Sequence, residues 1–434
     1  MGERACWFVG CVDEMMGMDR INGEDELINH MNGVDEMMGN NSDALVPWRE
    51  RALEVCDAVG LTRVLVGIES TDPGVFEGEI AGFVCDWFSF RGIETVREEV
   101  LPGRFNVMAR IPGVCEGPAL VFICHMDTVV AGDGWSEEFP PFGAVMKDGK
   151  IYGRGACDMK SGLACAMTVF ARMAACRRRL QYPLVFIGTM DEEDFMRGSE
   201  AAIRSGWVTE KDWILDMEPT NGQIQVAHKG RTWFEVTVEG ITAHAGTPWK
   251  GADAVACISE TICEIRRGIL ACPSHEDLGV STVTFGQIEG GYRPYVVPDR
   301  AKVWIDMRLV PPMNLEKAEE LVQTALDHAC RQVPGCRGSY VVTGSRPPVE
   351  KDPDSLLLAR LKEAADEITG QETVISTFPG YTDTAVISGI LGNHNCMSYG
   401  PGDLEMAHKP DEYVRCADIE RCEKVIRRLA EKMV

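Results

Sequence analysis

Three short runs of apolar residues stand out along the chain, at residues 119–124, 184–190 and 213–217. Each run is continuous rather than alternating, which is typical of a strand buried on both faces of a sheet. Apolar positions recur at helical spacing in the segments around these runs, at residues 49–59 (ended by Gly60), 77–90 and 161–177. Strands that alternate with helices predict an α/β fold built in layers.

The segment from residue 230 to residue 342 has a different rhythm. Residues 232–239 alternate between apolar and polar side chains, as in a strand with one exposed face. The pattern then predicts, in order, a helix, two strands, a helix and a final strand, with the central elements at residues 253–270, 280–287, 301–309 and 315–332. This order is typical of a small two-layer α+β (ferredoxin-like) domain.

The α/β pattern resumes near residue 355, with a helix at 355–368, a strand-like segment around Tyr399 and a terminal helix from about Ile419. The sequence therefore predicts an α/β domain of residues 45–229 and 343–434, interrupted by an inserted domain of residues 230–342. Residues 1–44 are rich in Met and acidic side chains, and residues 12–17 recur as 34–39. Two copies are too few for a solenoid, so we expect a poorly ordered extension, with an adaptable methionine-rich binding surface as the alternative.

Composition narrows the classes of partner. A net charge of -24 argues against nucleic acid or an anionic membrane surface as a partner. No apolar stretch approaches the roughly 20 residues of a membrane span, and we see no secretory signal. The 17 cysteines are scattered, without a Cys-x-x-Cys pair, which suggests packing thiols in a reducing compartment. We therefore expect a cytoplasmic protein.

Candidate chemistry lies where apolar runs end. Two imidazoles and several carboxylates follow such runs, namely His125, Asp158, Glu192, Glu193, Glu218 and, near the C-terminus, His408. Nitrogen and oxygen ligands of this kind suit a pair of divalent metal ions. In open α/β sheets, ligand sites gather at the carboxyl ends of strands, which is where His125, the Glu192-Glu193 pair and Glu218 fall. A spare carboxylate beside such ions is the base that a metal-activated water requires.

Each candidate also has a simpler interpretation. His125 alone could be a structural histidine, but Asp127 lies two residues on, where it can hydrogen-bond the imidazole of a ligand. Asp158 follows a glycine-rich turn. The turn has neither the Gly-x-x-x-x-Gly-Lys-Ser/Thr motif nor the Gly-x-Gly-x-x-Gly motif, so we exclude nucleotide binding. A carboxylate at this position can bridge two cations. Glu192 and Glu193 could be a solvated surface pair. Because adjacent side chains diverge, one of them can reach a metal while the other faces a substrate.

Over about residues 47–434 the chain resembles the co-catalytic zinc amidohydrolases, a family that includes aminoacylases, glutamate carboxypeptidases, acetylornithine deacetylases and succinyl-diaminopimelate desuccinylases. The resemblance rests on separated motifs in the family's order: residues 73–79, 125–129, 152–162, 191–193, 218–220, 242–246, 382–383 and 400–408. It implies a three-layer zinc-peptidase-like catalytic domain and an inserted domain that acts in dimerisation or as a lid.

The resemblance also implies roles. His125, Asp158 and Glu218 would hold one metal ion, and Asp158, Glu193 and His408 the other, so that Asp158 bridges them. Glu192 would be the general base and Asp127 would orient His125. His244 would reach the active site of a neighbouring subunit, and Arg308 would bind a substrate carboxylate. Two divalent ions per chain are implied, zinc first and cobalt or manganese as alternatives.

One departure concerns the substrate. The family often has Asn before a Val-Ile-Pro-like turn, and here Tyr295 precedes Val296-Val297-Pro298. A phenol donates one hydrogen bond but does not copy an amide, so the identity of the substrate stays open. We expect a homodimeric hydrolase of the amide bond in small N-acyl amino acids or dipeptides. The alternatives are a desuccinylase-like or acetylornithine deacetylase-like enzyme and, from another class, a catalytically silent dimeric scaffold that holds metal.

Overall fold

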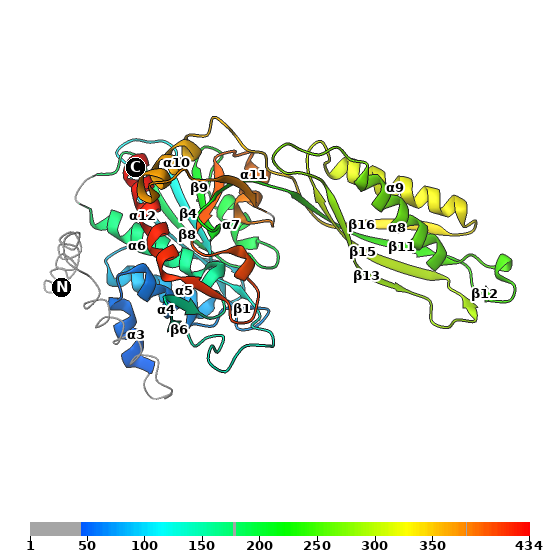
Figure 1. Cartoon of the computed structure of the whole chain (residues 1–434), viewed down its shortest axis with the longest axis horizontal. Helices are drawn as coiled ribbons and strands as arrows, with labels where there is room; N and C mark the ends of the chain where they lie inside the picture. The colour runs from blue at the N-terminus through cyan, green and yellow to red at the C-terminus, as the bar shows by residue number, and fades with distance from the viewer. Residues whose placement is uncertain (1–44, 177–178, 379) are drawn as a thin grey trace.

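A computed structural model describes residues 45–176, 179–378 and 380–434. The predicted poorly ordered extension, residues 1–44, lies outside the described residues. Figure 1 shows a layered α/β body from which a narrower unit projects to one side. None of the described helices is long and apolar enough to cross a membrane.

The α/β body is built on an eight-stranded mixed sheet. In spatial order its strands are β17 (Ile375–Phe378), β10 (Ile224–His228), β18 (Cys396–Gly400), β9 (Trp213–Pro219), β4 (Leu120–His125), β8 (Leu184–Thr189), β3 (Arg104–Ile111) and β2 (Val96–Leu101). The central strands β18, β9, β4 and β8 are parallel to one another, so their carboxyl ends meet at one edge. The three apolar runs of the sequence are β4, β8 and β9, as predicted.

Side chains of the central strands pack on both faces of this sheet. Leu120 and Phe122 of β4 join the larger core cluster, and Val121 and Ile123 join a second cluster on the other face. The larger cluster includes α4 (Ala58–Val66), α5 (Gly78–Phe90), α6 (Ser161–Ala175), α10 (Leu356–Thr369) and α12 (Cys416–Met433). The second includes α7 (Arg197–Arg204) and α11 (Asp383–Leu391). Helices on both faces make the predicted three-layer fold.

The prediction of one helix over residues 49–59 is wrong. The structure has two helices there, α3 (Leu45–Glu54) and α4, and Gly60 lies in the first turn of α4 instead of ending a helix. The reason is Asp57, whose extended backbone and side-chain hydrogen bond to the Gly60 N–H cap a new helix.

A small three-stranded sheet ties the C-terminal part of the chain to the segment that carries Asp158. Its strands are β6 (Val145–Lys147), β7 (Lys150–Tyr152) and β19 (Tyr413–Arg415), with Tyr413 opposite Tyr152. The sequence pattern did not predict these short strands. The pairing places the residues after β7 beside the residues before β19, although they are far apart along the chain.

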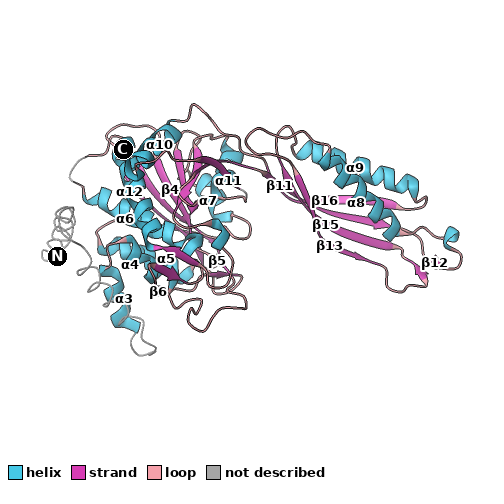
Figure 2. Cartoon of the chain, in the orientation of Figure 1, coloured by secondary structure: helices cyan, strands magenta, loops and turns pink. Residues whose placement is uncertain are grey.

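The projecting unit has the predicted order of elements: β11 (Gly230–Glu239), α8 (Ala254–Leu270), β13 (Thr282–Gly290), β15 (Arg300–Leu309), α9 (Leu315–Gln332) and β16 (Arg337–Arg346). Its antiparallel sheet has the order β13-β15-β11-β16, the arrangement of a two-layer ferredoxin-like unit. Phe234, Val236 and Val238 of β11 are buried against the helices, which cover one face (Figure 2). β16 continues past residue 342, the boundary that the sequence suggested.

Candidate active site

The carboxyl ends of the parallel strands hold the candidate ligands. His125 is the last residue of β4, Glu218 is the last but one residue of β9, and Glu192 and Glu193 follow β8. His408 lies in the loop that follows β18. Since these strands are neighbours in the sheet, their ends converge, and residues spread over almost 300 positions of sequence meet at one edge.

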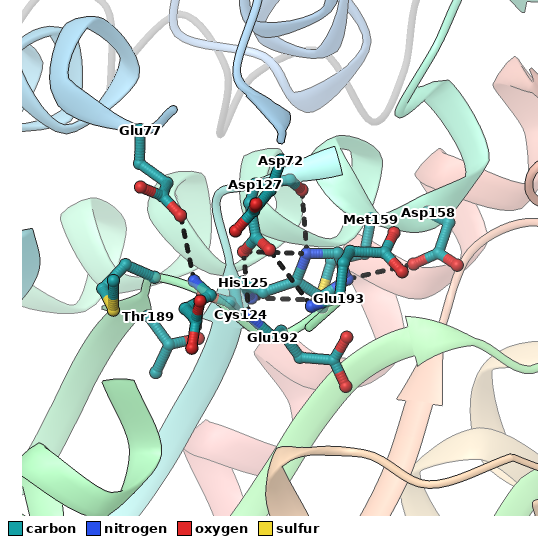
Figure 3. A network of polar contacts seen from close by, with 12 residues as sticks. Asp72, Glu77, Cys124, His125, Asp127, Asp158, Met159, Thr189, Glu192 and Glu193 are labelled. Atoms are coloured by element: carbon teal, nitrogen blue, oxygen red, sulfur yellow. Dashed lines mark hydrogen bonds and ion pairs between the residues drawn. The ribbon is translucent and has the colours of Figure 1, made fainter. Parts of the chain in front are cut away.

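Asp158 lies between the two histidines. It belongs to the irregular turn Ala156–Lys160 that leads into α6. Its Oδ1 is 3.0 Å from His125 Nε2, and its Oδ2 is 3.4 Å from His408 Nε2 (Figure 3 shows the first contact). His408 Nε2 is in turn 3.1 Å from Glu193 Oε1. One carboxylate that faces a different imidazole with each oxygen has the geometry of a bridge between two cations.

The remaining candidates belong to the same cluster. Ligand atoms of His125, Asp158 and Glu193 lie within 4.8 Å of one another, and so do those of His125, Glu192 and Glu218. The structure therefore brings together all five predicted metal ligands and the predicted base. Both glutamates of the pair lie within reach of His125, so proximity alone does not separate the base from the ligand.

The protonation behaviour of the cluster matches a site for cations. Burial, together with neighbouring carboxylates, raises the pKa of Glu192 and of Glu218 well above the usual range. Burial acts on Asp158 in the same direction, but hydrogen bonds from His125 and His408 outweigh it and lower the pKa of that carboxyl. The negative charge of these crowded, buried carboxylates exceeds what two imidazoles can balance. A pair of divalent ions would balance it. The residues fit the implied metals.

Asp127 contacts His125 differently from our expectation. His125 Nδ1 donates to the main-chain carbonyl of Asp127 at 2.9 Å, while the nearest carboxylate oxygen is 3.7 Å away. The Asp127 carboxylate instead accepts the N–H groups of Glu192, at 3.2 Å, and Glu193, at 3.1 Å (Figure 3). Asp127 therefore holds the imidazole through its backbone and the glutamate loop through its side chain.

A buried charge network behind this loop was missed by the sequence reasoning. Arg104 of β3 pairs with Asp72 at 2.5 Å, with Asp191 at 3.3 Å and with Glu77. Glu77 also accepts the Asp191 N–H at 2.9 Å, so the network holds the residue directly before Glu192. Glu77 lies in residues 73–79, one of the motifs that carry the family resemblance, but nothing in the sequence around Arg104 pointed to that residue.

Arg308 belongs to a row of three arginines, and the sequence pointed to neither of the other two. Arg308, Arg231 and Arg346 lie opposite one another on β15, β11 and β16. Arg308 is held by Asp306, with Nε 2.9 Å from Oδ1, and Arg346 pairs with Glu200 at 2.5 Å.

Within the described residues Arg231 has no carboxylate partner. Its guanidinium lies over the rings of Trp233, at 4.1 Å, and Tyr381, at 5.5 Å. Burial lowers the pKa of Arg231, as do the charges of Arg308 and Arg346, whereas the charge of Glu192 raises it. A partly buried cation near Glu192 is available to an anionic group of a ligand.

His244 and Tyr295 lie far from this cluster in their own chain. His244 belongs to β12 (Ala243–His244), which pairs with β14 (Val296–Val297) at the distal end of the projecting unit (Figure 1). Tyr295 is beside it, since its carbonyl accepts the Ala245 N–H at 3.1 Å, and its side chain is exposed. The structure thus separates these two predicted site residues from the others.

Comparisons with known proteins agree with this geometry. The model of peptidase family M20/M25/M40 matches residues 121–432. A probable succinyl-diaminopimelate desuccinylase of Staphylococcus aureus is 27% identical over 79% of this chain and 91% of its own. An acetylornithine deacetylase of Myxococcus xanthus is 28% identical over 89% and 97%.

Solved structures show the same fold. An aminopeptidase from Bacillus cereus superposes with a TM-score of 0.70 at 22% identity, over 87% of this chain and 98% of that one. A Bacillus subtilis protein described as a dinuclear metal-binding peptidase gives a TM-score of 0.65 at 18% identity, over 86% and 96%. Since the family model spans the strands that carry the whole cluster, the chain belongs to peptidase family M20/M25/M40 and is a metal-dependent hydrolase of amide bonds.

Proposed function

We propose that this protein hydrolyses the amide bond of small N-acyl amino acids or dipeptides, with two divalent ions, zinc in the first instance, held at the edge of the eight-stranded sheet. The observation that carries the proposal is the position of Asp158, whose two oxygens face His125 and His408. His125, Asp158 and Glu218 form one set of ligands, and Asp158, Glu193 and His408 the other.

The ions would supply Lewis-acid activation of a water molecule and of the scissile carbonyl. Glu192 takes the proton of the attacking water and passes it to the leaving amine. Its buried environment favours this role, because burial raises the pKa of the Glu192 carboxyl and so makes the carboxylate a stronger base. Asp127 holds the Glu192 and Glu193 amides, which keeps the base and the ligand on their own sides of the cluster.

The row of arginines supports a substrate with a carboxylate near the cleaved bond. We assign that carboxylate to Arg231 rather than to Arg308, because Asp306 already occupies the Arg308 guanidinium with two hydrogen bonds. Like charges placed opposite one another in a sheet are unfavourable, and an anionic substrate relieves the repulsion. Removal of a succinyl group is the second candidate, since the additional carboxylate of such a substrate suits the same row.

We further propose that residues 230–342 are a dimerisation domain and that the active form is a cytoplasmic homodimer. The support is His244, which belongs to β12 at the distal end of the projecting unit (Figure 1). Its Nδ1 accepts the Gly246 N–H at 3.0 Å, which leaves the proton on Nε2. An exposed imidazole N–H is suited to stabilise an oxyanion in the partner subunit, with Tyr295 beside it.

The test is a screen of metal-free and zinc-loaded protein against N-acetyl amino acids, N-succinyl amino acids and dipeptides. Turnover of at least one class only after loading, with two ions bound per chain, is the expected result. Glu192→Gln, loaded in the same way, is the matched control for contaminating hydrolases. Two bound ions without turnover of any class would favour the silent scaffold.

A further inference from the structure

A buried glutamate outside the ligand set connects two of the ligand-bearing segments. Glu412 lies four residues after His408 and directly before β19, and its residue is 0% exposed. Its Oε1 accepts the main-chain N–H groups of Cys157, at 2.8 Å, and Asp158, at 3.1 Å. Its Oε2 accepts Arg154 Nη1 at 2.5 Å. Both oxygens are therefore engaged by the Asp158 segment.

Arg154 is itself held in place. It is 2% exposed, and its Nη2 donates to the Ala131 carbonyl at 3.0 Å. The main chains of the two segments are joined as well, because the Gly153 N–H donates to the Glu412 carbonyl at 2.9 Å and Tyr413 pairs with Tyr152. Glu412 is thus anchored at its backbone while its side chain reaches the Asp158 turn.

The N–H of Asp158 requires this contact. Asp158 and Met159 have non-helical backbone angles inside the turn, so the turn is irregular where the ligand lies. A buried N–H must find a partner, and Glu412 supplies one to Asp158 and another to Cys157. The side chain of Glu412 therefore joins the Asp158 turn to the short segment that also carries His408.

We propose that Glu412 is a positioning residue that sets the distance between Asp158 and His408, so that both reach the same metal ion. The inference rests on the proposed function for the identity of the ligands. It goes beyond that proposal because it assigns the assembly of the second metal position to a residue that touches neither ion. Metal ligands need placement within about half an ångström, so a small movement of the Asp158 turn is enough to weaken this position.

The chain offers a matched control. Glu423 pairs with Arg172 at 2.9 Å and so joins α12 to α6, the helices that follow the two segments, without touching the Asp158 turn. Glu412→Gln and Glu423→Gln each remove one such charge. The metal-free protein of each variant is titrated with Co²⁺ and followed by visible absorption and by equilibrium dialysis. Hydrogen exchange of the peptide that covers residues 155–160 is measured without metal.

Wild type is expected to bind two Co²⁺ per chain. In Glu412→Gln the affinity for the second ion should fall at least about tenfold, the size of effect seen when a residue that holds a metal ligand is changed. The affinity for the first ion should fall less. Exchange of residues 155–160 should become faster. Glu423→Gln should match wild type in both measurements. If Glu412→Gln binds Co²⁺ with the same affinity as wild type and residues 155–160 exchange at the same rate, the inference is wrong.

A second variant covers the possibility that Glu412→Gln fails to fold. Glu412→Asp keeps the charge next to Arg154 but shortens the side chain by about 1.5 Å, one carbon–carbon bond, so the contacts with Cys157 and Asp158 stretch. It should show the same loss, and unchanged binding and exchange would contradict the inference. If wild type binds fewer than two ions, the metal assignment of the proposed function fails, while the exchange comparison still decides whether Glu412 holds the turn.

Discussion

Glu192 and Glu193 are neighbours in the chain but have different surroundings. Glu193 contacts His408, whereas the Glu192 side chain is buried without a hydrogen-bond partner among the described side chains. Both main-chain amides are held by Asp127. At the residue scale, this difference suits the proposed roles, in which Glu193 binds an ion and Glu192 moves a proton.

Replacement of Glu192 by Gln keeps the shape of the side chain and removes its basicity. Turnover should fall by about two to four orders of magnitude, the range for loss of a general base, with metal content unchanged. Steady-state kinetics and metal analysis of the purified variant check this. Glu193→Gln is the comparison and should lose bound metal. Metal loss in Glu192→Gln instead would mean that the two glutamates have exchanged roles.

The arginine row predicts a difference between two similar substitutions. Arg231→Met should raise KM for substrates with a free carboxylate by about tenfold or more, because a charge-assisted hydrogen bond contributes about 1.5–3 kcal/mol. It should change KM for the corresponding amides much less. Arg308→Met should have the smaller effect on free acids, since Asp306 engages that guanidinium. The reverse order would return the carboxylate to Arg308.

At the scale of elements, the site depends on segments that follow strands. The parallel ends of β18, β9, β4 and β8 define the edge, and the loops beyond them place the side chains. The loop at residues 191–193 is held from two directions, by Asp127 through two amides and by the network of Arg104, Glu77 and Asp72 through Asp191. The fold thus stabilises a loop that carries two crowded carboxylates.

Arg104→Met should destabilise the protein by about 3 kcal/mol or more, because it leaves buried carboxylates without their cation. Arg49→Met is the control, since the pair of Arg49 with Asp86 is exposed and should contribute at most about 1 kcal/mol. Urea denaturation measures both. Equal midpoints for the two variants would show that the buried network does not stabilise the loop.

At the scale of the whole molecule, His244 lies in β12 at the distal end of the projecting unit, away from the candidate ligands of its own chain (Figure 1). A residue at the far end of one subunit can act in catalysis only if a second subunit brings its active site there, and two-fold symmetry is the commonest arrangement. The activity is therefore expected to depend on association as well as on metal.

Mixing two inactive variants tests this. His244→Ala should lower kcat more than it changes KM, because its hydrogen bond forms mainly with the developing oxyanion. When His244→Ala and Glu192→Gln exchange subunits, a mixed dimer has one site with both groups intact, so activity should partly return. Proven exchange without any recovery would place the action of His244 within its own chain or nowhere.

The sequence by itself determined the three central strands, the order of elements in the projecting unit and the types of ligand. Burial patterns repeat over a few residues, and candidates such as His125 and Glu218 lie at the end of an apolar run. The same locality explains the error at residues 49–59, where the capping side chain of Asp57 outweighed helical spacing.

Tertiary structure alone decided which side chains meet. Glu412 reaches Asp158 from 254 positions away, and Arg104 reaches Asp191. Among the described residues Arg231 has no carboxylate partner, whereas Arg308 and Arg346 on the adjacent strands each have one. It also replaced the expected carboxylate partner of His125 by a main-chain carbonyl. Such contacts depend on strand order, register and loop packing, and no local pattern of residues contains that information.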